Sequence, residues 1–234
     1  MNFLVRLQGV FSAPQQTLKS VSEKPVWIDA LIIILIITAL FSYITAPYSQ
    51  KDSLQMLKDN VRLKERMGEE RYNQMIERLE NPSKTGTLVR SFLINPAFLL
   101  VGFLFASLLI LGMGRFTSTQ GKYAQVLSAY LHAQFIDKIL GNAVRLFLIL
   151  SRKSVLQTTT SLALFFPKME VTSASFVILS QVDFFQIWTF GILGYGLSQI
   201  FKIEMKKALL ISYGFWLIKS LFYIVIGLLS LRFM

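Results

Sequence analysis

The residues that could carry chemistry are sparse in this chain. The carboxylates within its apolar stretches are Asp29, Asp137 and Asp183, and its single histidine is His132. One histidine excludes an HExxH metal pair, and the lack of cysteine excludes thiolate metal sites, iron–sulfur clusters and a cysteine nucleophile. The P-loop, GxSxG and glycine-rich dinucleotide motifs are absent from the sequence as well. We therefore expect no enzyme activity, no metal site and no cofactor.

Polar residues concentrate in one apolar stretch, residues 123–151. At ~100° per residue, one side of this predicted helix carries a polar stripe, and a second polar group lies opposite. The stripe consists of Gln134, Asp137, Lys138, Gly141, Asn142 and Arg145, and the opposite group of Gln125, Ser128 and His132. Charges at bilayer depth are costly. The stripe therefore predicts either an internal ion pair that fixes a helix bundle or a transport or gating site.

The partner predicted for Asp137 is Lys219, the one charge in the last apolar stretch. At ~1.5 Å of rise per residue, the two residues lie at depths that agree within about one helical turn. Lys138 and Arg145 compete for the same carboxylate. His132 is predicted to be a hydrogen-bonded interior residue rather than a ligand or proton relay.

The composition indicates a membrane protein. Apolar residues make up 53% of the chain and charged residues 16%, against about 25% charged in soluble domains. The net charge is +11, and the basic residues lie mostly in gaps between apolar runs. We therefore expect the anionic headgroups of a lipid bilayer, and no nucleic acid, as the counter-charge.

Five stretches are long and apolar enough to cross a hydrocarbon core about 30 Å thick. These predicted spans are residues 26–44, 92–113, 123–151, 184–201 and 208–231. The fold class is therefore all-α, a polytopic protein with a five-helix membrane domain over residues 26–234. Close helix packing is predicted at small and aromatic residues of the last two spans, Gly191, Gly194, Gly196, Trp188 and Trp216.

Residues 47–91 are predicted to form an extramembrane helical loop between spans one and two. Pro47 closes the first span, and Gly68 divides the charged stretch 51–80 into a helical hairpin that ends at Asn81. This loop either caps the bundle or docks another protein. Residues 154–180 are too short to span, so a re-entrant or interfacial segment is expected there.

Residues 1–25 form an amphipathic segment that is expected to lie in the headgroup plane, as an anchor or as a sensor of the leaflet. Arg6 is predicted to lie away from the apolar side, which comprises Phe3, Leu4, Leu7, Val10 and Phe11. Ser12 is predicted to cap a second helix that holds Pro14 in its first turn.

The basic residues predict an orientation. Five spans place the termini on opposite sides of the membrane. The N-terminal segment and the gaps after spans two and four are rich in Lys and Arg, which favours a cytosolic N-terminus and an external C-terminus. The basic residues of loop 47–91 oppose this orientation. We nevertheless favour it, because the N-terminal segment and the two short gaps all indicate the same side.

Three stretches resemble the Yip (Ypt-interacting protein) family of polytopic membrane proteins, in its bacterial form. Residues 11–17 (FSAPQQT) are similar to the family's F-S-P-x-x-T-F motif, with an extra Ala and with Leu18 after the Thr. Residues 122–133 resemble the segment that leads into its third span. Residues 182–207, with Phe185, Trp188 and Gly196, resemble its most distinctive region. The resemblance implies five spans, a cytosolic N-terminus and, for this chain, the bacterial cytoplasmic membrane.

Two classes of function stay open. The first is a non-enzymatic integral membrane protein that organises protein partners or lipid. The resemblance adds that such a protein works as an accessory subunit of an ABC-type exporter, beside its membrane-fusion partners. The second is a small transporter or channel that uses the polar residues of the third span. A sealed bundle with an exposed hairpin favours the first class, and a water-filled path favours the second. Self-association into a homo-oligomer is left open.

Overall fold

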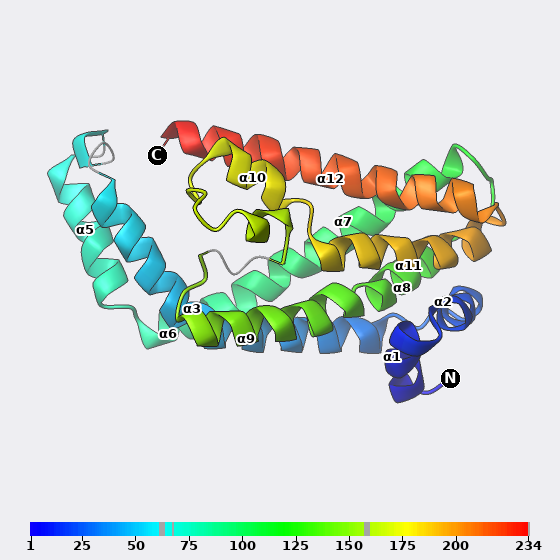
Figure 1. Cartoon of the computed structure of the whole chain (residues 1–234). Helices are drawn as coiled ribbons and strands as arrows, with labels where there is room; N and C mark the ends of the chain where they lie inside the picture. The colour runs from blue at the N-terminus through cyan, green and yellow to red at the C-terminus, as the bar shows by residue number, and fades with distance from the viewer. Residues whose placement is uncertain (61–63, 67, 157–159, 234) are drawn as a thin grey trace.

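The computed structural model describes residues 1–60, 64–66, 68–156 and 160–233 (Figure 1), and its named elements are all helical. The helices are α1 (Phe3–Ser12), α2 (Pro14–Glu23), α3 (Ile28–Asp59), α5 (Glu69–Glu80), α6 (Lys84–Val89), the π-helix η1 (Arg90–Ile94), α7 (Asn95–Arg115), α8 (Tyr123–Ala133), the π-helix η2 (Ile136–Gly141), α9 (Asn142–Arg152), the 3-10 helix η3 (Leu162–Phe165), α10 (Ala174–Ser180), α11 (Phe184–Phe201) and α12 (Met205–Phe233).

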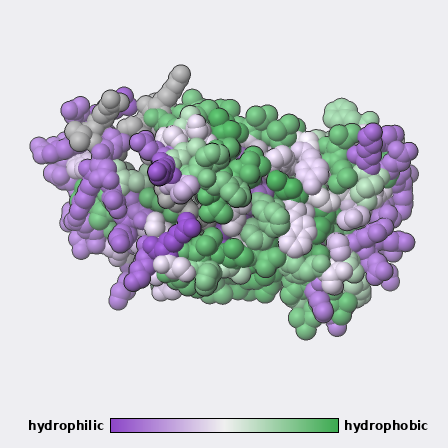
Figure 2. All heavy atoms as spheres, viewed as in Figure 1, coloured by the Kyte–Doolittle hydropathy of each residue, from purple (hydrophilic) through white to green (hydrophobic). Residues whose placement is uncertain are grey.

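The long helices run side by side between two ends of the molecule (Figure 1). The first end, which we call the α1 end, contains α1, α2 and the connections 116–122 and 202–204. The other, the α5 end, holds α5, α6 and the last turns of α3. Hydrogen bonds join the parts of the α1 end: Ser118 Oγ donates to the Phe201 carbonyl at 2.6 Å, and Gln125 Nε2 donates to the Ser22 carbonyl at 2.7 Å. Hydrophilic residues gather at both ends, with a hydrophobic band between them (Figure 2).

Among the described residues, three helices are long and apolar enough to cross a membrane: Ile28–Asp59, Lys84–Arg115 and Met205–Leu231. The chain is therefore an integral membrane protein by this criterion. The predicted third span is interrupted, because a turn at Gln134 and the π-helix η2 separate α8 from α9. The predicted fourth span, α11, has 18 residues. Membrane crossing by these two segments, and with it the count of five, stays a prediction.

Pro47 does not end the first helix, so no helix boundary lies there, and the start of the extramembrane loop at residue 47 stays a prediction. The helix continues through Pro47 to Asp59. A proline costs a helix one backbone hydrogen bond, but neighbouring contacts in a bundle can hold the continuation. Here Asp52 supplies such contacts, because its Oδ2 accepts hydrogen bonds from Ser154 Oγ at 2.9 Å and from the Val155 amide at 2.6 Å.

The predicted hairpin forms at the α5 end. Gly68 has a φ of 81° and directly precedes α5, which ends at Asn81 as the sequence predicts. The arms are joined by an ion pair between Lys58 and Glu80 at 2.7 Å and by a hydrogen bond from the Tyr72 hydroxyl to the Leu57 carbonyl. Residues 61–63 and 67 lie outside the described residues.

The N-terminal segment packs onto the bundle through α2, which contacts α8 and α11. Two details of the sequence prediction are wrong. Arg6 is 5% exposed, whereas Leu4, assigned to the apolar side, is 70% exposed. Ser12 ends α1 and donates its hydroxyl to the Gln8 carbonyl, so it does not cap α2, although Pro14 does begin that helix. Arg6 turns inward because its charge is neutralised there by a carboxylate, as described below.

The segment between α9 and α11 folds back into the bundle. Antiparallel hydrogen bonds join its two arms: the Leu162 amide donates to the Val182 carbonyl at 3.0 Å, and the Phe184 amide to the Thr160 carbonyl at 3.1 Å. Helix α10 packs along α12, and α11 begins partway along that helix (Figure 1). The segment therefore doubles back on itself, and its place within or at the surface of the membrane stays a prediction. Residues 157–159 lie outside the described residues.

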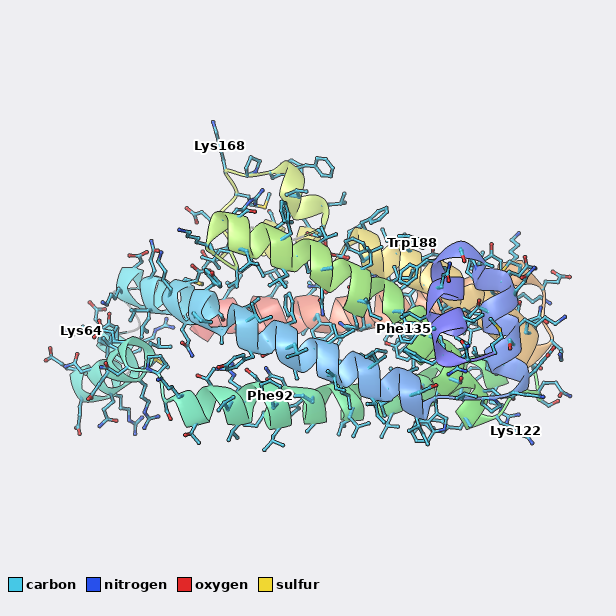
Figure 3. The ribbon with its side chains drawn as sticks, turned by 90° about the horizontal axis from the view of Figure 1, so that it is seen from below. Lys64, Phe92, Lys122, Phe135, Lys168 and Trp188 are labelled. Atoms are coloured by element: carbon cyan, nitrogen blue, oxygen red, sulfur yellow. The ribbon has the colours of Figure 1, made fainter. Side chains whose placement is uncertain are left out.

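The half of the bundle toward the α1 end is sealed by large side chains. Fully buried residues from α8 and α11 fill it, namely Leu127, Leu131, Phe190, Leu193, Leu197 and Phe201. Phe201 is accommodated by two glycines: a Cβ on Gly114 would lie 2.0 Å from its ring, and Gly121 beside it has a φ of +96°. In Figure 3, Phe135 lies beside the N-terminal helices, where its ring packs edge-on against Phe3 at 6.2 Å.

Candidate functional site

A cluster of charges lies where η2, α9 and α11 meet. Asp137 on η2 is almost completely buried, with 1% exposure. Its two carboxylate oxygens have separate partners: Oδ2 pairs with Lys138 Nζ at 2.7 Å, and Oδ1 with Arg145 NH2 at 2.8 Å. The carboxylate is therefore neutralised from two sides within its own segment of chain.

Arg145 on α9 connects this carboxylate to a second one. Its NH2 group lies 3.1 Å from both oxygens of Asp183, and its Nε donates to Thr160 Oγ1 at 3.2 Å. A planar guanidinium has five donors in a fixed fork, which suits it to several acceptors at once. Arg145 on α9 thus joins η2, which directly precedes its own helix, to the start of α11, which is distant in sequence.

Asp183 also caps α11. Its Oδ1 accepts hydrogen bonds from the amides of Phe185 at 2.9 Å and Gln186 at 3.2 Å. These are amides that a helix start leaves without intrahelical partners. An N-terminal carboxylate also suits the positive end of the helix dipole. The cap lets α11 begin inside the bundle without exposed donors.

Lys219 on α12 does not pair with Asp137. Its Nζ donates to Gln186 Oε1 at 2.5 Å and lies 5.0 Å from the centre of the Phe190 ring. The predicted ion pair is therefore not formed. Asp137 and Lys219 line the same cavity, but Lys138 and Arg145 reach Asp137 first. Lys138 bends back to its sequence neighbour, and the wider π-helical turn of η2 carries Arg145 onto the same side.

A cavity of about 650 Å³ lies beside the cluster. Helices α7, α8, η2, α11 and α12 line it, with Gln134, Lys138, Arg145, Gln186 and Lys219 on its polar side. Aromatic residues form much of the remaining wall, including Phe103, Tyr130, Phe215, Trp216, Phe222 and Tyr223. Ligand cavities of proteins have volumes of roughly 300–1,000 Å³ and mostly apolar walls. The arrangement can hold a small or amphipathic molecule.

His132 belongs to a different cluster, at the α1 end. It is fully buried, and its Nε2 accepts a hydrogen bond from Arg6 Nε at 3.2 Å. Its Nδ1 therefore carries the proton and donates to the Ser128 carbonyl at 2.8 Å. Arg6 also forms an ion pair with Asp29 at the start of α3. The group Arg6–His132–Asp29 fastens α1 to the first turn of α3 and to α8.

The remaining predicted residues are distributed around these two clusters. Asn142 is buried and its Oδ1 accepts from Arg145 NH1 at 3.3 Å. The glycines of α11 lie at close approaches: a Cβ on Gly191 would lie 2.9 Å from the Tyr213 hydroxyl, and one on Gly194 would lie 2.6 Å from Leu209. Gly196 faces Ala129 of α8 at 2.9 Å. Trp188 packs against Phe184 at 6.0 Å.

Sequence reasoning missed three members of the site. The sequence predicts no partner for Asp183 and no role for Gln186, and Thr160 lies outside any predicted span. A local signal for the first two exists, because Asp183 followed three residues later by Gln186 is the capping pattern of a helix start. No such signal joins Thr160 to Arg145, because their contact depends on how the intervening segment folds back.

Within the described parts of the chain, no group of three or more metal-ligating side chains occurs. The fold and the two clusters define an all-helical integral membrane protein whose interior charges mostly compensate one another. The Yip1 domain family matches residues 9–227, so the chain belongs to this family, as its motifs indicate. No curated protein and no solved structure matches it.

Proposed function

We propose that this chain is a non-enzymatic membrane protein that organises a protein partner through its α5 end. The observation that carries the proposal is the contrast between the two halves of the molecule. The α1 half is filled by fully buried side chains, while the α5 end presents a polar hairpin that extends past the apolar band (Figure 2). A packed interior with an exposed hairpin favours an organising role over a conduit.

The docking surface of this proposal is a groove of about 1580 Å³ at the α5 end. It lies between the last turns of α3, helix α5 and residues 152–154 and 170–172. Basic residues outnumber acidic ones along it: Lys51, Arg71, Arg78, Arg152 and Lys153 face Asp52, Asp59 and Glu170. This balance suits an acidic segment of a partner. The family resemblance makes an ABC-type exporter or its membrane-fusion subunit the first candidate partner to examine.

The proposed location is the bacterial cytoplasmic membrane, with the N-terminus in the cytosol and the C-terminus outside. Its support is that the three basic segments favoured as cytosolic lie together at the α1 end, where Lys19, Lys24, Lys122, Lys206 and Lys207 are all exposed. Positive charge on one side of a membrane protein marks its cytoplasmic side. The α5 end and its groove then face outward.

Photo-crosslinking in cells tests the docking role. A crosslinking residue replaces Met75, which lines the groove and is 41% exposed. We expect a discrete protein adduct that disappears in the double variant Arg71→Glu/Arg78→Glu, since both side chains line the groove. The matched control places the crosslinker at Leu210, an exposed apolar residue of α12. Adducts that are unchanged by the charge reversal, or full cellular function in a chain lacking residues 69–80, would refute the docking role.

A small transporter is the second candidate, because the 650 Å³ cavity lies beside ionised side chains. A conduit must continue past the sealed half of the bundle, so transport requires that half to open. Flux of ions or small solutes across vesicles that contain the purified protein would favour this alternative. The flux must also change in the variant Lys219→Met.

A further inference from the structure

The cavity beside Lys219 has an incomplete charge balance. Two carboxylates, Asp137 and Asp183, face three cations, Lys138, Arg145 and Lys219, which leaves one positive charge. Lys138 and Arg145 take up both carboxylates in ion pairs. Within the described parts of the chain, no carboxylate lies within 4.0 Å of Lys219 Nζ, whose hydrogen-bond partner is the neutral amide of Gln186. Lys219 is half-buried, and a cation without a counter-charge is unfavourable in an apolar environment.

Two further polar groups of the cavity wall lack partners. The hydroxyl of Ser220, a residue with 5% exposure, has no hydrogen-bond partner, and neither does Nε1 of Trp216. The indole nitrogen can only donate, and the hydroxyl can donate as well. Buried polar groups are nearly always satisfied in folded proteins. The wall of the cavity formed by the described residues of α12 therefore carries one ammonium without a counter-charge and two donors without partners, and it offers no anionic acceptor to any of them.

The rest of the wall selects an amphipathic anion over a soluble one. Phe105 of α7 and Ile218 and Phe222 of α12 line the same cavity and are 59%, 54% and 62% exposed. These apolar residues belong to helices that are long and apolar enough to cross a membrane, so their exposed sides face lipid. We propose that the cavity binds one anionic phospholipid of the bilayer, with its phosphate on Lys219 and an acyl chain between α7 and α12.

Trp216 provides a direct readout, because bromine atoms on an acyl chain quench an indole on contact. The protein is prepared with Trp27→Phe and Trp188→Phe, which leaves Trp216 as the single tryptophan, and placed in phosphatidylcholine vesicles. Brominated phosphatidylglycerol then replaces part of the lipid, with brominated phosphatidylcholine as the matched neutral series. We expect a roughly tenfold preference for the anionic lipid, the scale of a charge-assisted hydrogen bond. Equal quenching by the two lipids would overturn the proposal, and this result needs no substitution at the site itself.

Variants locate the site. Lys219→Gln should abolish the preference, Lys219→Arg should retain it, and Lys206→Gln at the α1 end should leave it unchanged. A preference that survives Lys219→Gln would place the lipid elsewhere and overturn the assignment. Two competitors identify the source of the anion. If brominated fatty acid quenches more strongly than phosphatidylglycerol, or if inorganic phosphate removes the preference, the ligand is not a phospholipid.

Discussion

At the scale of single residues, Arg145 is the group that the charged cluster depends on most. It is the shared cation of Asp137 and Asp183, and both carboxylates are largely buried. Removing one partner of a buried ion pair costs more than the pair contributes, because the remaining charge is left without compensation. Lys138 binds one carboxylate only, although its side chain is exposed to much the same extent as that of Arg145, 23% against 20%.

We therefore predict that Arg145→Met destabilises the protein by about 3–5 kcal/mol, the scale of a broken buried pair. Lys138→Met, the matched control in the same cluster, should cost less. Thermal unfolding in detergent, followed by circular dichroism, measures both. The double variant Asp137→Asn/Arg145→Met should recover part of the loss, and strictly additive losses would show that the two residues do not interact.

A second residue-scale prediction concerns the contact between α1 and the bundle. Arg6→Met removes the ion pair with Asp29 and the hydrogen bond to His132. We expect hydrogen exchange of the α1 amides to rise by roughly tenfold, the scale of one charge-assisted hydrogen bond. Lys19→Met, which changes an exposed charge on α2, is the control. Unchanged exchange in Arg6→Met would mean that apolar packing alone holds α1.

The sequence predicted which residues would be polar and interior but not how they pair. Helical geometry placed Asp137, Lys138, Asn142 and Arg145 on one stripe, and the structure brings them together. The choice of Lys219 as partner failed because it rested on depth and on a uniform angle per residue. The π-helical turn and the bend of a long lysine side chain are decided by tertiary contacts, which the periodicity of a sequence does not contain.

At the scale of the elements, Gly196 of α11 and Gly112 of α7 differ in their surroundings. A Cβ on Gly196 would lie 2.9 Å from Ala129, whereas one on Gly112 of α7 would have nothing within 4 Å. Gly196→Ala should therefore destabilise the bundle by about 1–3 kcal/mol through overpacking. Gly112→Ala should be neutral or slightly stabilising, since alanine favours helix. Equal melting temperatures for the two variants would contradict the close approach of α8 and α11.

Element positions followed from hydrophobicity, and element ends followed from the sequence only in part. The first, second and last apolar stretches became long helices, and Gly68 and Asn81 bound α5 as expected. Pro47 failed as a boundary because Asp52 and its partners on residues 154–156 hold the continuation of α3. Arg6 does not lie on the outward side of α1 as predicted, because its partners Asp29 and His132 come from α3 and α8. Both errors arise from contacts between segments that are distant in sequence.

At the scale of the whole molecule, the central claim is that the α1 end and the α5 end lie on opposite sides of one membrane. Figure 3 shows Lys122 at one end and Lys64 and Lys168 toward the other. The hydrogen bond and ion pair to Glu69 raise the pKa of Lys64, so this lysine stays protonated at neutral pH. The chain contains no cysteine, so a single introduced cysteine reports its own position without a background signal.

The most direct test is labelling of single-cysteine variants in intact cells with a membrane-impermeant maleimide. Lys64→Cys and Lys168→Cys should react in intact cells, whereas Lys122→Cys and Lys206→Cys should react only after the membrane is opened. Reaction of all four variants after lysis is the control for accessibility. Labelling of Lys122→Cys or Lys206→Cys in intact cells, or protection of Lys64→Cys there, would contradict this arrangement of the molecule in the membrane.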